Sequence, residues 1–345
     1  MSNSLNDKGW SEFFLTEIFP TIQRGKRLTK ANQIKGRQPY ISSTAANNGV
    51  DNYISNSTGV RLFGDCLTIA NSGSVGSSFY QPFEFIASDH VTHLKNNNLT
   101  KPAYLFIAAQ TNRLSGKYNF SREINDKRVS REKILLPIDE EKKPDWIYIE
   151  RYSKSILERK KKEYKKYAKK SLKDLEYKDI SSLKEKDWKP FKIEEVFNAN
   201  KGVYLNKNDI ISGVTPYITA TSNNNGITDF IGNEFLFPKN TITVEKISLS
   251  SFYQSLDFYC SHDVSVLSNV NLNKFNSLFI VTMIKRQGLK YSYGRQAQLS
   301  VVKRETVYLP VDESNNPDWH FMAQYIKNLE YKKIKEYLNY LSQDE

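Results

Sequence analysis

The spacing of apolar positions predicts two kinds of element that alternate along the chain. Short runs rich in β-branched and aromatic residues, such as RLFGDCLTIA at residues 61–70, predict strands. Residues 103–114 and 276–287 carry apolar side chains at helical spacing on one face. Residues 147–172 and 320–341 have apolar positions three and four apart and predict longer helices. The expected fold is therefore α+β, with β-rich globular parts and long helices.

This pattern occurs twice. Residues 39–54 read PYISSTAANNGVDNYI and residues 216–231 read PYITATSNNNGITDFI, with eight of sixteen positions identical. The offset is 177 residues here and 173 residues from Phe79 onward, so the first copy has four extra residues in between, among them the glycine-rich NSGSVGSS. A period this long indicates one domain per copy rather than a solenoid. A loop that differs between otherwise matching copies is where we expect their specificity to differ.

Each copy begins with a similar series of short elements. A tryptophan opens a short amphipathic segment, and a glycine with basic neighbours, Gly25 or Gly202, then predicts a loop. The PYI segment predicts a strand, and the Asn-Asn-Gly after it predicts a hairpin turn with positive φ.

The repeat also predicts the domain boundaries. Neither apolar stripe can be buried by its own helix, so we expect the two helices to pack antiparallel about a pseudo-twofold axis. The expected contacts are Tyr152 and Ile156 in the first helix and Tyr325 and Leu329 in the second. The predicted parts are residues 1–146 (first domain), 147–187 (helix and linker), 188–319 (second domain) and 320–345 (second helix).

Charge indicates an acidic partner. The net charge is +12 and the pI about 9.3, and residues 151–189 hold 15 Lys or Arg against 7 Asp or Glu. Nucleic acid is the first candidate, and the alternative is a merely solubilising surface. Cys66 and Cys260 do not match under the repeat, so neither a disulfide nor a metal cluster is predicted, and a reducing cytoplasm is expected. No secretion signal or membrane-spanning run is predicted.

Motifs for catalysis are absent or fail on geometry. The sequence lacks the Asn/Asp-Pro-Pro-aromatic motif and glycine-rich turn of an adenine methyltransferase, and it lacks a Walker-type GxxxxGK. A nuclease-like pattern, Pro144-Asp145 with Glu158 and Lys160, recurs from Pro317. Asp145 and Glu158 would lie about 20 Å apart along a helix, too far to share a metal.

Two further motifs favour structural roles. Asp89-His90 and His262-Asp263 occupy matching places in swapped order, which favours a buried polar pair at a strand end over a catalytic dyad. The glycines of NSGSVGSS favour a tight loop over a phosphate cradle, because the second copy lacks them.

The remaining polar and basic residues lie in predicted loops and could contact DNA. Arginine can recognise guanine, and Asn or Gln can recognise adenine, so the candidate base contacts are Arg122, Arg295, Gln296, Asn47, Asn48, Asn224 and Asn225. The alternative for the asparagines is that they only make turns. Candidate phosphate contacts are Arg24, Lys26, Arg27, Lys201 and the lysine-rich helix. Neighbouring candidates for DNA contact are Ser72, Ser74, Tyr204, Lys246 and Tyr293.

Taken in order, these features resemble the specificity (S) subunits of Type I restriction-modification systems and the similar subunits of Type IIB systems. The features are PYI(S/T) with the NNG turn, FGDCLTIANSGSVGSSFY, SDHV, and LP(I/V)D…PDW before each helix. The resemblance implies a protein that catalyses nothing and recognises a bipartite sequence in double-stranded DNA. It also implies spacer and docking helices, no cofactor on this chain, and separate adenine methyltransferase and endonuclease subunits that use S-adenosylmethionine and magnesium.

Two other functions stay open at this point. One is a self-sufficient nuclease with a diverged motif, which the lack of a repeated carboxylate cluster argues against. The other is an RNA-binding or scaffold protein, which the 21 Tyr and 19 Phe allow.

Overall fold

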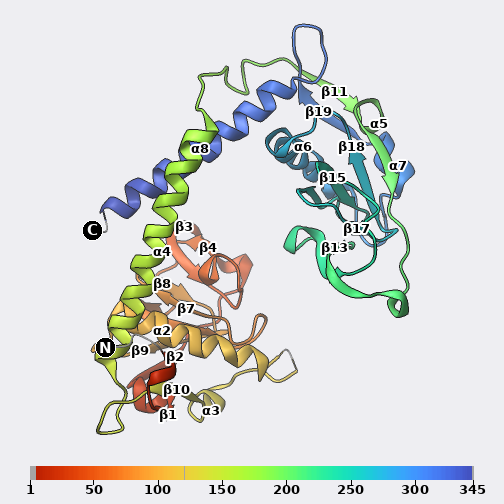
Figure 1. Ribbon diagram of the computed structural model, residues 1–345. Helices are drawn as coiled ribbons and strands as arrows, with labels where there is room; N and C mark the ends of the chain where they lie inside the picture. Colours follow the sequence, from red (N-terminus) through yellow and green to blue (C-terminus); the bar gives the residue numbers. More distant parts are fainter. Residues whose placement is uncertain (1–4, 120, 344–345) are drawn as a thin grey trace. The chain divides into compact units, whose positions relative to one another are not determined.

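The computed structural model describes residues 5–119 and 121–343 and divides into two compact units, Met1–Glu163 and Tyr164–Glu345 (Figure 1). The division falls inside a long helix rather than at its start. The ends of the predicted ranges 1–146 and 320–345 (residues 1–4, 344 and 345) lie outside the described residues.

The described residues of the first unit form three sheets. A two-stranded antiparallel sheet pairs β1 (Trp10–Phe14) with β10 (Lys133–Pro137) and joins the beginning of the domain to its end. The four strands of an antiparallel sheet are, in spatial order, β2 (Thr21–Arg24), β9 (Val91–Lys95), β6 (Cys66–Ala70) and β7 (Ser78–Gln81). The other four-stranded sheet has the order β4 (Val50–Ile54), β3 (Lys35–Ile41), β8 (Phe85–Ala87) and β5 (Leu62–Phe63), with β3 and β8 parallel.

Short helices complete this unit. α2 (Lys101–Thr111) confirms the predicted helix, and its Tyr104 and Ile107 lie in the main core with Leu67 and Leu94 of the sheet. Pro102 in its first turn suits a helix start, because the N–H that proline lacks would have no partner there. The other helical segments are α1 (Leu15–Ile18), α3 (Asp126–Val129) and the 3-10 turns η1 (Leu5–Asp7), η2 (Lys30–Asn32), η3 (Asn47–Gly49) and η4 (Asn112–Gly116).

The second unit repeats this plan. β11 (Trp188–Lys192) pairs with β19 (Thr306–Pro310). Its larger sheet has the order β12 (Asn198–Lys201), β18 (Val264–Ser268), β15 (Thr241–Glu245) and β16 (Ser251–Gln254), and its smaller sheet the order β14 (Ile227–Ile231), β13 (Ser212–Ile218) and β17 (Tyr259–Cys260). A single bridge between Phe237 and Phe258 stands where the first unit has β5. The helical segments are α5 (Ile193–Val196), α6 (Lys274–Gln287), which confirms the other predicted helix, α7 (Leu299–Arg304), and the 3-10 turns η5 (Lys207–Asp209), η6 (Asn224–Gly226) and η7 (Gly288–Lys290).

The four-residue difference between the copies lies in two places, not in the glycine-rich loop alone. The loop between β6 and β7 covers residues 71–77, and its counterpart between β15 and β16 covers residues 246–250. Two of the four residues are therefore lost there. The other two are lost between β4 and β6, where residues 55–65 correspond to residues 232–240.

The two long helices, α4 (Trp146–Leu175) and α8 (Trp319–Gln343), begin in the same way. Asp145 accepts a hydrogen bond from the Tyr148 backbone N–H at 2.9 Å and pairs with Lys8 at 2.6 Å. Asp318 does the same with the Phe321 N–H at 2.8 Å and with Lys186 at 2.8 Å. The aspartate of each nuclease-like pattern is therefore a helix N-cap, which explains its repetition.

The first turns of each helix pack on the domain that precedes them, which corrects the predicted helix contacts. Tyr152 lies edge-on to Phe106 of α2, with ring centroids 6.2 Å apart, and Tyr325 lies edge-on to Phe279 of α6 at 5.8 Å. Ile156 is half-buried and Leu329 is 42% exposed. Because each helix comes directly after its domain, Tyr152 and Tyr325 in its first turns pack on that domain's core.

Within the second unit, the last turns of α4 pack against α8. The buried side chains are Ala168, Leu175 and Ile334, flanked by Tyr164, Leu172, Tyr331 and Leu338. The Tyr164 ring lies edge-on to that of Tyr337 at 4.7 Å, whereas further along the Asn328 amide donates to the Lys178 carbonyl at 2.6 Å. Residue numbers increase along α4 and the segment after it where they decrease along α8, so the two helices pack antiparallel as predicted. The residues in contact differ from the predicted ones. None of the helices in the described part of the chain is long and apolar enough to span a membrane.

Candidate nucleic-acid interface

The Asn-Asn-Gly turns adopt the predicted conformation in both units. Asn47, Asn48 and Gly49 have φ of 49°, 53° and 83°, and the three residues of η6 have nearly the same values. All four asparagines of the two turns are exposed. In the second unit the Asn224 amide donates to the Ile227 carbonyl, and the Asn225 amide to the Tyr253 carbonyl and Gln254. These bonds support the turn-making role, whereas a base contact stays a prediction.

The amide of a buried glutamine donates a hydrogen bond to the backbone of each of these turns. The Gln81 amide donates to the Asn48 carbonyl at 2.7 Å and to Thr68 Oγ1 at 3.3 Å. The Gln254 amide donates to the Asn225 carbonyl at 3.2 Å and to Thr243 Oγ1 at 2.9 Å. Sequence reasoning missed this pair, although both glutamines lie at the same offset as the aligned Phe-Tyr pair beside them.

The glycines in the basic loops allow one chain segment to cross another closely. A Cβ on Gly25 would lie 2.2 Å from the Ser88 carbonyl oxygen, and one on Gly202 would lie 2.1 Å from that of Ser261. Lys26 and Arg27 come after the first crossing, Lys201 precedes the second, and all three are exposed. Their exposure is compatible with the predicted phosphate contacts.

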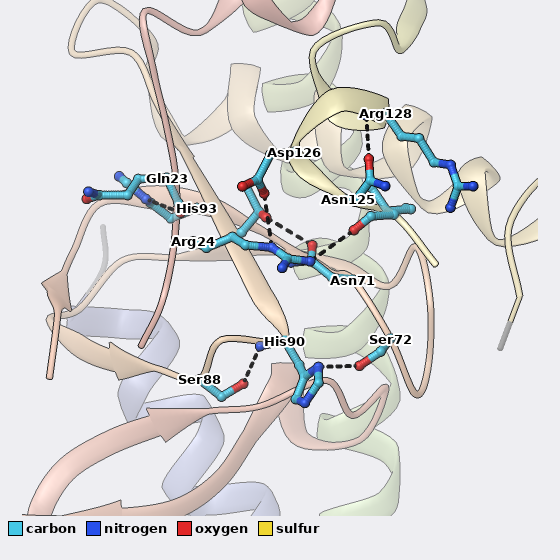
Figure 2. Close-up of polar contacts among 12 residues, drawn as sticks. Gln23, Arg24, Asn71, Ser72, Ser88, His90, His93, Asn125, Asp126 and Arg128 are labelled. Atoms are coloured by element: carbon cyan, nitrogen blue, oxygen red, sulfur yellow. Dashed lines mark hydrogen bonds and ion pairs between the residues drawn. The ribbon is translucent and has the colours of Figure 1, made fainter. Parts of the chain in front are cut away.

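Arg24, in contrast, is held inside its own domain. Its Nε lies 3.0 Å from Asp126 Oδ1 and its Nη2 donates to the Ile124 carbonyl at 3.3 Å. With the Asn71 amide turned by 180°, the amide oxygen accepts from Arg24 Nε at 2.8 Å and Nη2 at 3.1 Å. Figure 2 shows the Arg24 guanidinium between Asp126 and Asn71. Much of its charge is thus already paired, which leaves less for a phosphate.

The loop from residue 71 to 77 meets the other loops of the first unit. Ser72 is buried and its Oγ lies 2.8 Å from His90 Nδ1 (Figure 2), while the Ser74 N–H donates to the Ser43 carbonyl at 3.0 Å. Asp89 and His90 are half-buried and exposed, so the expectation of a buried polar pair was wrong. They lie in the loop before β9.

The corresponding loop of the second unit is built by different means. In the first unit Gly73 and Gly76 supply φ of 59° and 85°. In the second, the buried Glu245 carboxylate accepts the backbone N–H groups of Ile247, Ser248 and Ser250 at 2.7, 2.6 and 3.0 Å. Both constructions make a tight turn, as predicted for the glycine-rich loop of the first unit.

Charged groups are also rearranged around this second loop. Lys246 lies 2.7 Å from Asp263, which is 3.3 Å from His262 Nε2. The exposed Tyr204 ring lies edge-on to His262 at 5.4 Å, and both line an open hollow of about 850 Å³ beside the β13–β14 hairpin. Lys246 is thus paired within the unit, whereas Tyr204 lies open to a ligand.

The predicted arginines lie in two matching turns. A bridge between Asn119 and Arg122 closes one, and a bridge between Ser292 and Arg295 closes the other. Both arginines are exposed, and Tyr293 beside the second is 81% exposed. The Gln296 amide donates to the Tyr293 carbonyl at 3.3 Å, so it is engaged locally.

Hydrogen bonds join these loops into one surface in each unit. In the first, the Ile124 N–H donates to the Asn71 carbonyl, and in the second the Ala297 N–H donates to the Lys246 carbonyl at 2.7 Å. Across residues 5–119 and 121–343, no three His, Cys, Asp or Glu side chains come together as a metal site would require. The arrangement offers exposed basic, amide and aromatic side chains on rigid loops, which suits polyanion binding.

The family assignment comes from comparison with known proteins. The sequence profile of the Type I restriction modification DNA specificity domain matches residues 7–166 and 185–339. The chain is 30% identical over 333 residues to the specificity subunit S.BcgI of the Type II restriction enzyme BgcI from Heyndrickxia coagulans, which covers 94% of this chain and 96% of that subunit.

Solved structures of S subunits also align with it. One is the S subunit of a Type I restriction-modification system from M. genitalium (TM-score 0.47, 16% identity, covering 98% of this chain and 93% of that one). Another is the HsdS subunit from Thermoanaerobacter tengcongensis (TM-score 0.32, 13% identity, covering 95% and 91%). Since the family profile matches once in each half and covers most of the sequence, the chain belongs to the Type I restriction-modification DNA specificity domain family.

Proposed function

We propose that this chain recognises a bipartite DNA sequence, with one half-site for each unit. The observation that carries the proposal is the loop surface that occurs twice on nearly the same scaffold but with different side chains. In the first unit Arg24 pairs with Asp126 and, with the Asn71 amide turned, with the Asn71 oxygen. In the second unit Lys246 and Asp263, which follow β15 and precede β18 as Asn71 and His90 follow β6 and precede β9, pair with each other instead. A conserved scaffold with exchanged loop chemistry is what two readers of different sequences require.

The chemistry is assigned to other subunits. As a member of a family of specificity subunits, this chain acts in target recognition rather than catalysis. We propose that it binds no cofactor and docks adenine methyltransferase subunits, which use S-adenosylmethionine, and an endonuclease activity that uses magnesium. The S.BcgI relative is named as the specificity subunit of a restriction enzyme, which supports the proposed partnership with an endonuclease activity.

Exposed arginines are the proposed base contacts. Replacing Arg295 with Ala should weaken binding to one half-site by about 1–3 kcal/mol, the range for one good bidentate contact, and Arg122→Ala should affect the other half-site. An equal loss for every DNA sequence would instead make Arg295 a phosphate contact.

The long helices are the proposed spacer. At about 1.5 Å per residue, inserting four residues in both α4 and α8 adds roughly 6 Å and rotates the chain beyond each insertion by about 40°. The preferred spacer between half-sites should then lengthen by about one or two base pairs, which sequencing of the methylated sites would show. An unchanged spacer would exclude the helices as the ruler.

Two experiments test the function as a whole. Purification from the native host with mass spectrometry should recover a methyltransferase subunit. Selection from a pool of randomised duplexes by the full chain, with any subunit that co-purifies, should enrich two short motifs at a fixed spacing. Enrichment of no sequence, or better competition by single-stranded RNA than by duplex DNA, would refute the proposal. Cleavage by the pure chain with magnesium would favour a self-sufficient nuclease.

A further inference from the structure

A buried carboxylate lies behind each of the two exposed arginine turns. Glu132 is 4% exposed and Glu305 is 7% exposed. Lys117 Nζ lies 2.8 and 2.9 Å from the two oxygens of Glu132, and the Tyr118 hydroxyl donates to Glu132 Oε1.

The second unit repeats this group. Lys290 Nζ lies 2.6 Å from Glu305 Oε1, and the Tyr291 hydroxyl donates to Oε2 at 2.5 Å. Burial alone would raise the pKa of Glu305, but the hydrogen bonds from Lys290 and Tyr291 outweigh it and leave that pKa below its ordinary value. Burial and the bond to the carboxylate raise the pKa of Tyr291 to about 12, as they do for Tyr118, so both hydroxyls stay protonated donors.

Each tyrosine ring supports the arginine four residues further on. The Arg122 guanidinium carbon lies 5.3 Å from the centre of the Tyr118 ring, and that of Arg295 lies 5.9 Å from the Tyr291 ring. Neither arginine has a carboxylate partner in the described part of the chain, unlike Arg24 with Asp126. The two guanidinium groups are therefore oriented by a ring and keep their charge available.

From this geometry we propose that Glu132 and Glu305 are positioning residues for DNA recognition. Each fixes a tyrosine, and the tyrosine ring orients Arg122 or Arg295 toward the half-site of its unit. This role rests on the proposed function, in which Arg122 and Arg295 contact the bases. A side chain oriented before binding loses less conformational freedom when DNA binds. If the carboxylate only joined β10 or β19 to the neighbouring turn, nothing would require the tyrosine ring to lie against an arginine that has no carboxylate partner.

The test is a double-mutant cycle on the full chain with any co-purifying subunit, using the selected duplex with a fluorescent label. Glu305→Gln should weaken binding by about two- to tenfold, the cost of ordering one flexible side chain, and Tyr291→Leu by at least as much. Arg295→Ala should weaken it by about five- to 150-fold. In the Arg295→Ala background, adding Glu305→Gln should then change affinity less than about twofold.

Controls separate positioning from stability. A duplex with the half-site of the second unit scrambled should be bound equally by wild type and Glu305→Gln, while Glu132→Gln should still weaken binding to it. If Glu305→Gln is unfolded at the assay temperature, Tyr291→Phe, which deletes only the hydroxyl, takes its place in the cycle.

The possible outcomes are distinct. Equal fold-losses for Glu305→Gln with and without Arg295 would overturn the positioning role, as would an Arg295→Ala variant that binds like wild type. Both results leave the specificity function standing, since wild type still selects its sequence. Failure of the wild-type protein to select any sequence would refute the proposed function itself.

Discussion

Replacing Gly202 with alanine should destabilise the second unit and displace its basic loop. The added Cβ would lie 2.1 Å from the Ser261 carbonyl oxygen and 2.7 Å from that of Cys260, whereas ordinary contact begins near 3.4 Å. The segments must separate by about 1.3 Å, which strains the bonds from the Gly202 N–H to Val264 and from the Val203 N–H to Cys260, both 2.9 Å long. Overpacking costs about 1–3 kcal/mol and each weakened hydrogen bond up to about 1 kcal/mol more, so we expect about 2–4 kcal/mol.

Calorimetry and hydrogen exchange together would measure this loss. For a unit of this size each kcal/mol lowers the Tm by about 2–4 °C, so a fall of roughly 5–15 °C is expected. Exchange should increase in β12, β17 and β18 and stay unchanged in the first unit. Gly294→Ala is the matched control, because its Cβ would meet nothing within 4 Å. Equal melting of the two variants would show that the close crossing is not what requires glycine at position 202.

Three further predictions concern the second unit. Gln254→Ala removes a 3% exposed amide that donates to the Asn225 carbonyl and to Thr243. It should lower the free energy of unfolding by about 1–3 kcal/mol and speed hydrogen exchange at residues 223–227, and unchanged exchange there would contradict the role of Gln254. The pKa of Glu305 lies below its ordinary 4.5, so the stability that its carboxylate contributes is present above pH 4.5 and is lost as the pH falls through the depressed value. The Tm of the wild type should therefore fall more steeply with acid than the Tm of Glu305→Gln. Parallel curves of Tm against pH would contradict this. Ile334→Ala opens a cavity beside Ala168 and Leu175 and should cost about 2–5 kcal/mol in thermal unfolding, while the exposed Asn339→Ala should cost almost nothing.

The repeat carried most of the information that the sequence holds about the fold. It predicted two domains, the strands and turns around Asn-Asn-Gly, and the helices α2, α6, α4 and α8, because these depend on local patterns that occur twice. It did not predict which helix residues meet. Spacing alone does not distinguish a stripe that packs on a domain from one that packs on a second helix, so it does not place Tyr152. Tyr164 and Ala168, which do meet α8, lie among lysines and form no visible apolar stripe.

The site was predicted less completely, because hydrogen-bond partners far apart in sequence leave no local pattern. Arg24 lies in a basic loop, as a phosphate contact would, but Asp126, about 100 residues later, pairs with it. Glu132 and Glu305 were visible as an aligned pair, yet only the fold places them behind Tyr118 and Tyr291. Matched polar residues at one offset, such as Gln81 and Gln254, were the available signal for buried clamps.

The helix α4 belongs to two cores, and this has a consequence for recombination. Ile149 and Tyr152 pack on the first core, while Tyr164, Ala168 and Leu175 pack with α8 in the second unit. A gene crossover at residues 157–163 would transfer the first domain with every helix residue its core needs and leave the α8 contacts untouched. A crossover in the linker after Leu175 would instead import foreign partners for Ile334. The lysine-rich middle of the helix is thus a position at which one specificity domain can be exchanged without disturbing either core.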